Sequence, residues 1–190
     1  MHNFFETIQP FKPYIFKLHF EFDWQELKPL CEELIVGNDA RSTSQRNSTK
    51  PHYYIKQFKN FYNWIIPWVN NLANSEMSFN EYPMQYYVTD SYVNVHRNGA
   101  QASEHNHACN SIVVAAYLNM PENGGYFEAK DPLELLNSNG YHNMSEWRWK
   151  EIKTISGDIL IFPSWLIHRT QKNESDEGRY VMTTNFVTRF

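Results

Sequence analysis

Two histidines at a spacing of two, His105 and His107, are the residues of this sequence best suited to hold a metal ion. Side chains two positions apart on an extended strand point to the same side, so both imidazoles can reach one ion. Imidazole binds iron, zinc, copper and nickel, and residue type alone therefore does not select the metal. Taken alone, such a pair is more often two histidines at the surface or at the edge of a core.

A third histidine, His168, follows residues 157–162, which indicate a tight turn and then a buried strand. A lone histidine at the end of a strand is usually structural. A late strand of a sheet can, however, return beside an early one. We therefore expect His168 to lie beside the first pair, which would complete a set of three ligands.

Arg179 begins the last predicted strand, and its side chain shares a face with those of Val181, Thr183 and Asn185. An arginine that faces the inside of a sheet is costly unless it meets an anion. A dicarboxylate would pair with the guanidinium through two parallel hydrogen bonds, which lysine does not reproduce as well. The alternative is an ordinary ion pair with one of the nearby acids, Glu174, Asp176 or Glu177.

The elements that must position these side chains are short strands in the second half of the chain. Runs rich in Val, Ile, Tyr, Phe and Thr are separated by turn residues, and no helical pattern of useful length divides them. Parallel strands need such crossovers, so we expect mainly antiparallel pairing in a sandwich or jelly roll. The predicted strands are 84–95, 111–119, 125–129, 147–155, 158–162 and 179–188.

The first third of the chain is predicted to be helical. Apolar residues recur at helical spacing after Asp23, which begins what resembles a capping box, and Gly37 is expected to end that helix. A second helix carries an aromatic stripe over residues 58–72, with Pro67 as a kink or restart. Residues 37–51 are almost entirely polar and predict a surface loop.

Composition indicates one folded domain. The chain has 190 residues, of which 42% are hydrophobic, and its net charge of −4 predicts no strong affinity for nucleic acid or an anionic membrane. The two cysteines, Cys31 and Cys109, are expected to be buried, reduced thiols. We find no signal peptide and no apolar run long enough for a membrane span, so the cytoplasm is the expected compartment.

Seven short motifs follow one another along the sequence. They are YVNVHRNG at 92–99, HNH at 105–107, YL at 117–118, GYF at 125–127, DP at 131–132, GDILIFPSWLIH at 157–168 and RYVMTTNF at 179–186. This ordered set resembles the 2-oxoglutarate/Fe(II) oxygenases of the prolyl-4-hydroxylase-like superfamily, and most closely a small branch found in marine bacteria and tailed phages. The resemblance covers residues 84–190 well and the helical N-terminus loosely. It implies a mainly β fold, a double-stranded β-helix or jelly-roll barrel whose mouth holds the metal.

The resemblance also implies roles for individual residues. The first family histidine falls on His105 and the distal one on His168, so both are expected to ligate iron. The arginine that binds the far carboxylate of 2-oxoglutarate falls on Arg179. Further candidate contacts to the cosubstrate are Asn94, His96 and, more weakly, Tyr117.

One departure concerns the second ligand, because the superfamily usually has Asp or Glu where this chain has His107. Three histidines contribute no negative charge, so the iron site would be one unit more positive. We expect tighter 2-oxoglutarate binding and an altered redox potential, with a different metal or lost activity as the alternatives. The acids that could replace His107 are Glu104, which has the wrong strand parity, and Glu128 and Asp131, whose loop would have to fold back.

We therefore expect a single oxygenase domain over 1–190, helical at 1–82 and with a jelly-roll core at 83–190. The expected reaction is hydroxylation of an unidentified substrate, one candidate being a protein side chain, with Fe(II), 2-oxoglutarate and dioxygen. If a phage carries the gene, the compartment would be the host cytoplasm. Two alternatives stay open: a cupin-like three-histidine metalloenzyme that does not use 2-oxoglutarate, and an inactive jelly-roll binding module.

Overall fold

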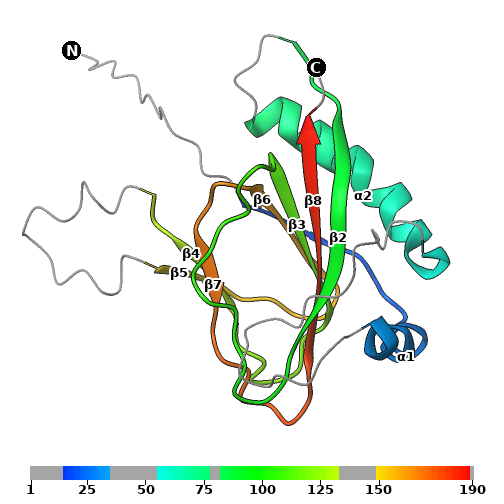
Figure 1. Cartoon of the computed structure of the whole chain (residues 1–190), viewed down its shortest axis with the longest axis vertical. Coiled ribbons are helices and arrows are strands. Elements are labelled where there is room, and N and C mark those ends of the chain that lie inside the picture. The colour runs from blue at the N-terminus through cyan, green and yellow to red at the C-terminus, as the bar shows by residue number, and fades with distance from the viewer. Residues whose placement is uncertain (1–14, 35–54, 78–81, 133–148, 189–190) are drawn as a thin grey trace, which may run out of the picture.

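A computed structural model of the chain describes residues 15–34, 55–77, 82–132 and 149–188. Two antiparallel sheets form its body (Figure 1), one with strand order β1-β6-β3-β8-β2 and one with strand order β5-β4-β7. Every strand pairing within these sheets is antiparallel, as the sequence predicted. The strands are β1 (Phe16–His19), β2 (Tyr86–His96), β3 (Ile112–Asn119), β4 (Phe127–Lys130), β5 (Trp149–Ile152), β6 (Asp158–Pro163), β7 (His168–Thr170) and β8 (Arg179–Thr188).

Helices cover the outer face of the larger sheet (Figure 1). They are α1 (Trp24–Leu34), a 3₁₀ turn η2 (Lys56–Phe58), α2 (Lys59–Leu72) and a π-helical turn η3 (Ala73–Met77). The predicted N-cap is present, because the backbone N–H of Glu26 donates to the Asp23 carboxylate at 3.1 Å. Pro67 lies inside α2, which continues to Leu72. The predicted helix end at Gly37 and the loop 37–51 lie outside the described residues.

Alternation along the strands creates two separate cores. Even-numbered residues of β8, such as Met182 and Phe186, join the aromatic stripe of α2 in the outer core. The odd-numbered residue Val181 faces the space between the two sheets, together with Phe127 of β4 and Phe162 of β6. The interior of the barrel is therefore lined by alternate residues of both sheets.

A bulge near Thr89 changes the alternation of β2. The register against β8 shifts between Val88 and Asp90. Before the shift, Tyr86 and Val88 pack into the outer core, and after it Val93 and Val95 do so. A bulge adds one residue to one strand and so reverses the parity of the side chains beyond it. Asp90 and the alternate residues that follow it therefore face the interior of the barrel.

The structure departs from the sequence predictions in several places. The first third of the chain is not only helical, because β1 pairs with β6 at the edge of the larger sheet. The three-residue strand β7 was not predicted as a strand. Cys31 is buried as expected, but the same prediction for Cys109 is wrong, because that thiol is exposed. Of the helices described, none combines the length and apolar character needed to cross a membrane.

Candidate metal centre

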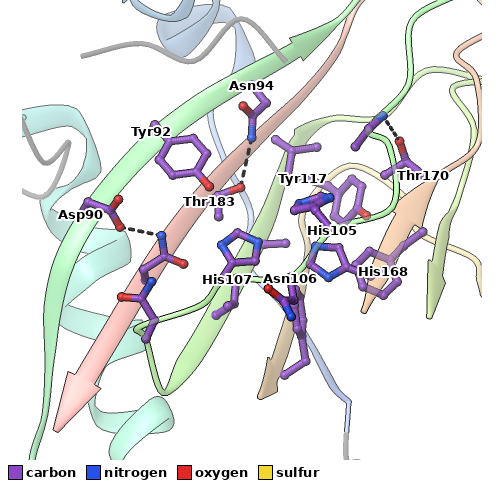
Figure 2. Close-up of a pocket in the computed structure, with 18 of the residues that line it drawn as sticks. Asp90, Tyr92, Asn94, His105, Asn106, His107, Tyr117, His168, Thr170 and Thr183 are labelled. Carbon is purple, nitrogen blue, oxygen red and sulfur yellow. Dashed lines mark hydrogen bonds between the residues drawn. The ribbon is translucent and has the colours of Figure 1, made fainter. Parts of the chain in front are cut away.

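The three predicted histidines come together at one end of the barrel (Figure 2). His105 and His107 lie on the segment between β2 and β3, and His168 begins β7. One ring nitrogen from each can be chosen so that all three lie within 4.8 Å of one another. The rings of His107 and His168 are nearly parallel, with 6° between their planes and 5.2 Å between their centroids. Three nitrogen donors at this spacing can surround a single metal ion.

Backbone hydrogen bonds hold the ligand-bearing segment in place. The N–H of His105 donates to the carbonyl of His168 at 3.0 Å, and the N–H of His168 donates back at 2.9 Å. The N–H of His107 donates to the carbonyl of Ser164 at 2.9 Å. The segment 105–107 thus continues the smaller sheet beyond β7. The spacing of two residues brings both of its histidines to one side.

Two of the imidazoles are oriented by backbone carbonyls. Nδ1 of His105 lies 2.6 Å from the carbonyl oxygen of Ser103, and Nδ1 of His168 lies 2.9 Å from that of Leu166. A carbonyl oxygen only accepts hydrogen bonds, so Nδ1 must carry the hydrogen in both rings. The lone pair of each Nε2 is then available for a metal, which is the usual arrangement of metal-binding histidines.

Burial keeps one of the three imidazoles, that of His168, neutral. Burial is the main reason that the pKa of His168 falls to about 3, and the imidazoles of His105 and His107 act in the same direction. His168 is therefore neutral at physiological pH, as a ligand must be. The described residues offer no carboxylate to the histidine cluster. Glu104 pairs instead with Lys130 at 2.8 Å, and Glu128 pairs with Arg169 at 2.6 Å.

The histidines open into a cavity of about 370 Å³ between the two sheets. Its walls are the alternate, inward-facing residues of the strands, and its rim is formed by the segment that carries His105 and His107 (Figure 2). The strands contribute Asp90, Tyr92, Asn94 and His96 (β2), Val113, Ala115 and Tyr117 (β3), Phe127 (β4), Phe162 (β6), His168 and Thr170 (β7), and Val181, Thr183 and Asn185 (β8).

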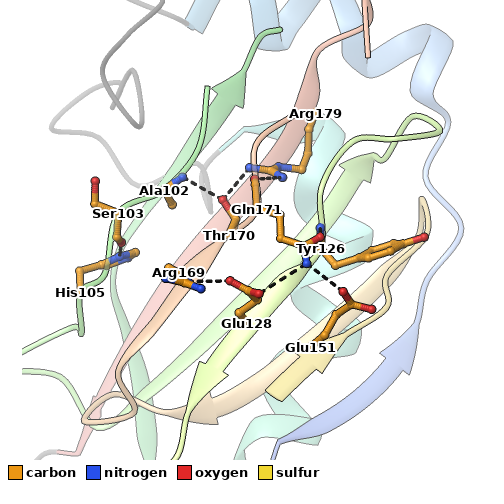
Figure 3. Close-up of polar contacts among 10 residues, drawn as sticks. All are labelled: Ala102, Ser103, His105, Tyr126, Glu128, Glu151, Arg169, Thr170, Gln171 and Arg179. Carbon is orange, nitrogen blue, oxygen red and sulfur yellow. Dashed lines mark hydrogen bonds and ion pairs between the residues drawn. The ribbon is translucent and has the colours of Figure 1, made fainter. Parts of the chain in front are cut away.

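Arg179 lies behind the cavity wall and does not line it. Its side chain is fully buried, and Nη1 donates to the carbonyls of Gly124, Gly125 and Gln171 at 2.5–3.1 Å. Nη2 donates to the hydroxyl of Thr170 at 2.7 Å, and Thr170 does line the cavity (Figure 3). The guanidinium therefore reaches the cavity through the Thr170 hydroxyl.

The positive charge of Arg179 has no acidic partner in the part of the chain that the structure describes. The alternative of an ion pair with Glu174, Asp176 or Glu177 is thus not found. The Nε atom is buried without a hydrogen-bond partner among these residues. Burial lowers the pKa of Arg179 to about 10, and it raises the pKa of the neighbouring Tyr117 to about 12. At neutral pH the guanidinium is charged and the phenol is protonated.

The cavity also holds the remaining predicted site residues. Asn94, His96 and Tyr117 all line the cavity. Sequence reasoning missed Asp90 and Thr170. Thr170 stands two residues after His168 on the same strand, and Asp90 stands four before Asn94, so alternation from the predicted residues pointed to both.

A sequence profile of the family described as "Putative 2OG-Fe(II) oxygenase" matches residues 90–185, just over half of the chain. The chain belongs to this family of 2OG-Fe(II) oxygenases. The matched residues run from Asp90 to Asn185 and include every predicted site residue. The family resemblance noted in the sequence is therefore confirmed, and Fe(II) and 2-oxoglutarate are the cofactors of this oxygenase. Among curated proteins, none matches the sequence.

Several solved structures have a similar fold. A prolyl-4-hydroxylase of Pseudomonas putida has 12% identity and a TM-score of 0.62, with 94% of each chain covered. A Trichoplax adhaerens prolyl hydroxylase, in complex with a peptide fragment of the hypoxia inducible factor oxygen degradation domain, has 12% identity and a TM-score of 0.63, with 91% of this chain and 83% of that chain covered. HygX of Streptomyces hygroscopicus, with nickel, 2-oxoglutarate and hygromycin B bound, has 11% identity and a TM-score of 0.63, with 94% and 84% covered.

At these identities the likeness shows the fold alone. That fold is the double-stranded β-helix, as predicted, with the interior of the barrel between the two sheets.

Proposed function

We propose that the oxygenase binds Fe(II) through His105, His107 and His168 and hydroxylates a C–H bond of its substrate. The observation that carries this proposal is the convergence of three ring nitrogens within 4.8 Å. Backbone carbonyls fix the ring hydrogens of two of these imidazoles, so their Nε2 lone pairs are available to a metal. Nitrogen ligands of this kind suit iron.

The far carboxylate of 2-oxoglutarate fits the end of the cavity near Arg179. The Thr170 hydroxyl accepts N–H bonds from Ala102 at 2.8 Å and from Arg179 at 2.7 Å (Figure 3), so its own hydrogen remains to be donated. The protonated phenol of Tyr117 can donate as well. Together they offer a carboxylate two hydroxyl donors backed by a buried, uncompensated cation.

Asn94 is suited to a second contact with the cosubstrate. Its amide nitrogen donates to the Thr183 hydroxyl at 3.2 Å. Because a hydroxyl can also donate, the amide can rotate and turn its N–H groups toward an anion in the cavity. His96 lies beside it and pairs in register with Arg179 on β8, so it lines the same end of the cavity.

Bound iron and 2-oxoglutarate supply the chemistry, in which dioxygen converts a substrate C–H to C–OH while 2-oxoglutarate becomes succinate and carbon dioxide. The protein contributes positions and shielding. Phe127 and Phe162 close one side of the cavity next to His168, with ring centroids 5.1 and 4.9 Å from its ring. These apolar walls exclude water from one side of the metal position.

Succinate formation tests this proposal. The purified protein is loaded with Fe(II) and 2-oxoglutarate without oxygen and is then exposed to air, alone and with pools of peptides, nucleosides and metabolites. We expect succinate to form, to increase with the right pool, and to be lost in His168→Ala. Turnover that needs no 2-oxoglutarate would support the cupin-like alternative, and absence of iron binding would support an inactive binding module. The expected cytoplasmic compartment, in the host if a phage carries the gene, remains a prediction.

A further inference from the structure

Asn185 lines the cavity at the end that lies far from Arg179. The two residues are six positions apart on β8, a separation of about 20 Å in an extended strand. The register partner of Asn185 on β2 is Asp90. In Figure 2, Asp90 and Thr170 lie on opposite sides of the three histidines. The proposed function places the far carboxylate of 2-oxoglutarate near Arg179 and Thr170, and it leaves the Asn185 end of the cavity to another molecule.

The side-chain amide of Asn185 is turned so that its oxygen has no partner. Its Nδ2 donates to the Asp90 carboxylate at 2.6 Å. A carboxylate oxygen accepts hydrogen bonds, so the nitrogen must face Asp90 and the oxygen must face away from it. Oδ1 has no hydrogen-bond partner among the described residues, although the side chain is only 2% exposed. A buried acceptor that no donor reaches is costly.

The backbone holds this acceptor in a fixed place. Asn185 lies on β8, which is paired on both sides, with Asp90 of β2 and Val113 of β3 as its register partners. The Thr89 hydroxyl also donates to the Asn185 carbonyl at 3.1 Å. A polar group carried by a central strand is held more precisely than one carried by a loop. The Asn185 Oδ1 is therefore a preorganised acceptor.

The cosubstrate cannot supply the missing donor. At neutral pH, 2-oxoglutarate carries two carboxylates and a ketone, and all of these groups accept hydrogen bonds. Dioxygen carries no hydrogen at all. Of the molecules that the proposed reaction brings into the cavity, only the substrate can therefore donate to Asn185.

We infer that Asn185 accepts a hydrogen bond from an N–H or O–H group of the substrate, an amide or a hydroxyl. This inference rests on the proposed function, because it assigns the Arg179 end of the cavity to 2-oxoglutarate. A substrate without such a group leaves Oδ1 buried and unpaired, and that cost counts against its binding. Asn185 is thus a specificity-determining residue.

Hexanamide, 2-heptanol and 2-heptanone probe this acceptor, because they are similar in size and only the first two carry a donor. Binding is measured by ligand-observed NMR titration on the full chain loaded with 2-oxoglutarate and zinc, which takes the place of iron and prevents turnover. A donor group loses more than a ketone on leaving water, so a cavity without an acceptor prefers 2-heptanone. We expect at least one of the two donors to bind about threefold to tenfold more tightly than 2-heptanone, and the tighter one tells an amide site from a hydroxyl site.

Asn185→Leu keeps the size of the side chain and removes the acceptor. We expect the order to reverse in this variant, so that 2-heptanone binds most tightly. Asn119→Leu is the matched control, because it makes the same change at another asparagine of the sheet. The Asn119 amide donates to the Gly178 carbonyl at 2.9 Å and lies outside the cavity lining, so the preference for a donor should persist. Zinc affinity, measured on each variant, reports whether the barrel has folded.

The inference is overturned if 2-heptanone binds to the unaltered chain as tightly as both donors, if neither donor binds at millimolar concentration, or if a folded Asn185→Leu keeps the preference. The comparison on the unaltered chain decides even where Asn185→Leu does not fold. No turnover is needed, so a chain that prefers a donor but forms no succinate contradicts the proposed function alone. A chain that forms succinate but shows no such preference contradicts this inference alone.

Discussion

His105 and His168 exchange backbone hydrogen bonds, each N–H donating to the other's carbonyl, at 3.0 and 2.9 Å. Two of the three candidate ligands are therefore joined through the main chain before a metal arrives. The third, His107, is tied to the turn after β6 through the Ser164 carbonyl. Such a site is preorganised, so metal binding should need little rearrangement of the backbone.

Removing one imidazole should abolish tight metal binding. His168→Ala leaves two ligands, and we expect zinc affinity to fall by more than the roughly 10–100-fold typical of losing a residue that merely orients a ligand. Calorimetry under oxygen-free conditions measures the affinity. His19→Ala is the control, because His19 lies on β1 beside Asp158 and outside the cavity lining. Unchanged zinc affinity in His168→Ala would contradict the proposed ligand set.

Restoring the carboxylate usual in the superfamily should weaken the hold on 2-oxoglutarate. His107→Asp keeps three ligands but adds a negative charge next to the cosubstrate, which we expect to lower 2-oxoglutarate affinity about tenfold or more. His107→Asn has the same shape without the charge and serves as the matched variant. Both are measured by calorimetry on zinc-loaded protein. Equal affinities in the two variants would show that charge at this position does not matter.

Gly125 and Gly99 allow a steric effect to be separated from backbone strain. Both have positive φ, +77° and +79°, but a Cβ on Gly125 would meet the Lys172 carbonyl oxygen at 2.3 Å, whereas one on Gly99 would meet nothing within 4 Å. Gly99→Ala should lower the free energy of unfolding by about 1–2 kcal/mol. Gly125→Ala should lower it by about 3 kcal/mol or more, because backbone must move.

A shift of the backbone at Gly125 should also disturb the end of the cavity near Arg179, where we place the far carboxylate of 2-oxoglutarate. The reason is that the Gly125 carbonyl accepts a hydrogen bond from Arg179 at 2.6 Å. We expect weaker 2-oxoglutarate binding in Gly125→Ala and unchanged binding in Gly99→Ala. Urea unfolding and calorimetry measure the two effects. Equal losses of stability in the two variants would mean that the close approach of Gly125 to Lys172 adds nothing to the cost of placing a methyl group there.

The Thr170 hydroxyl should be needed for cosubstrate binding as well as for stability. Thr170→Val keeps the shape but leaves N–H groups of Arg179 and Ala102 without their acceptor, so unfolding should become easier by about 1–3 kcal/mol. We also expect about tenfold weaker 2-oxoglutarate binding, and Thr170→Ser should restore both properties. A loss of stability without a loss of affinity would reduce Thr170 to a structural role.

Most of what the sequence predicted about the site came from the alternation of side chains between the two faces of a strand. It placed His105 and His107 on one side of an extended segment, and it placed Thr183 and Asn185 on the face of Arg179. The structure brings these histidines to His168 and lines the cavity with both β8 residues. Strand composition and the lack of crossover helices were sufficient to predict antiparallel sheets.

Features that depend on tertiary contacts were not predictable in this way. β1 has only four residues, and its partner, β6, lies far along the chain, so no local sequence pattern indicates this strand or its pairing. The exposure of Cys109 follows from a turn in which its φ is +69°, and burial propensity says nothing of that turn. Arg179 was expected to face the cavity, but backbone carbonyls and Thr170 hold its guanidinium behind the wall.

The bulge near Thr89 divides β2 into two stretches whose side chains alternate with opposite parity. Upstream of it, even-numbered residues belong to the helical layer; downstream, even-numbered residues belong to the reaction chamber. A one-residue deletion at Thr89 would remove the extra residue and leave Val88 toward the helices and Asp90 toward the chamber, in uninterrupted alternation. Evolution or design can therefore gain or lose this one codon without exchanging any side chain that meets a substrate, and all three histidines stay untouched.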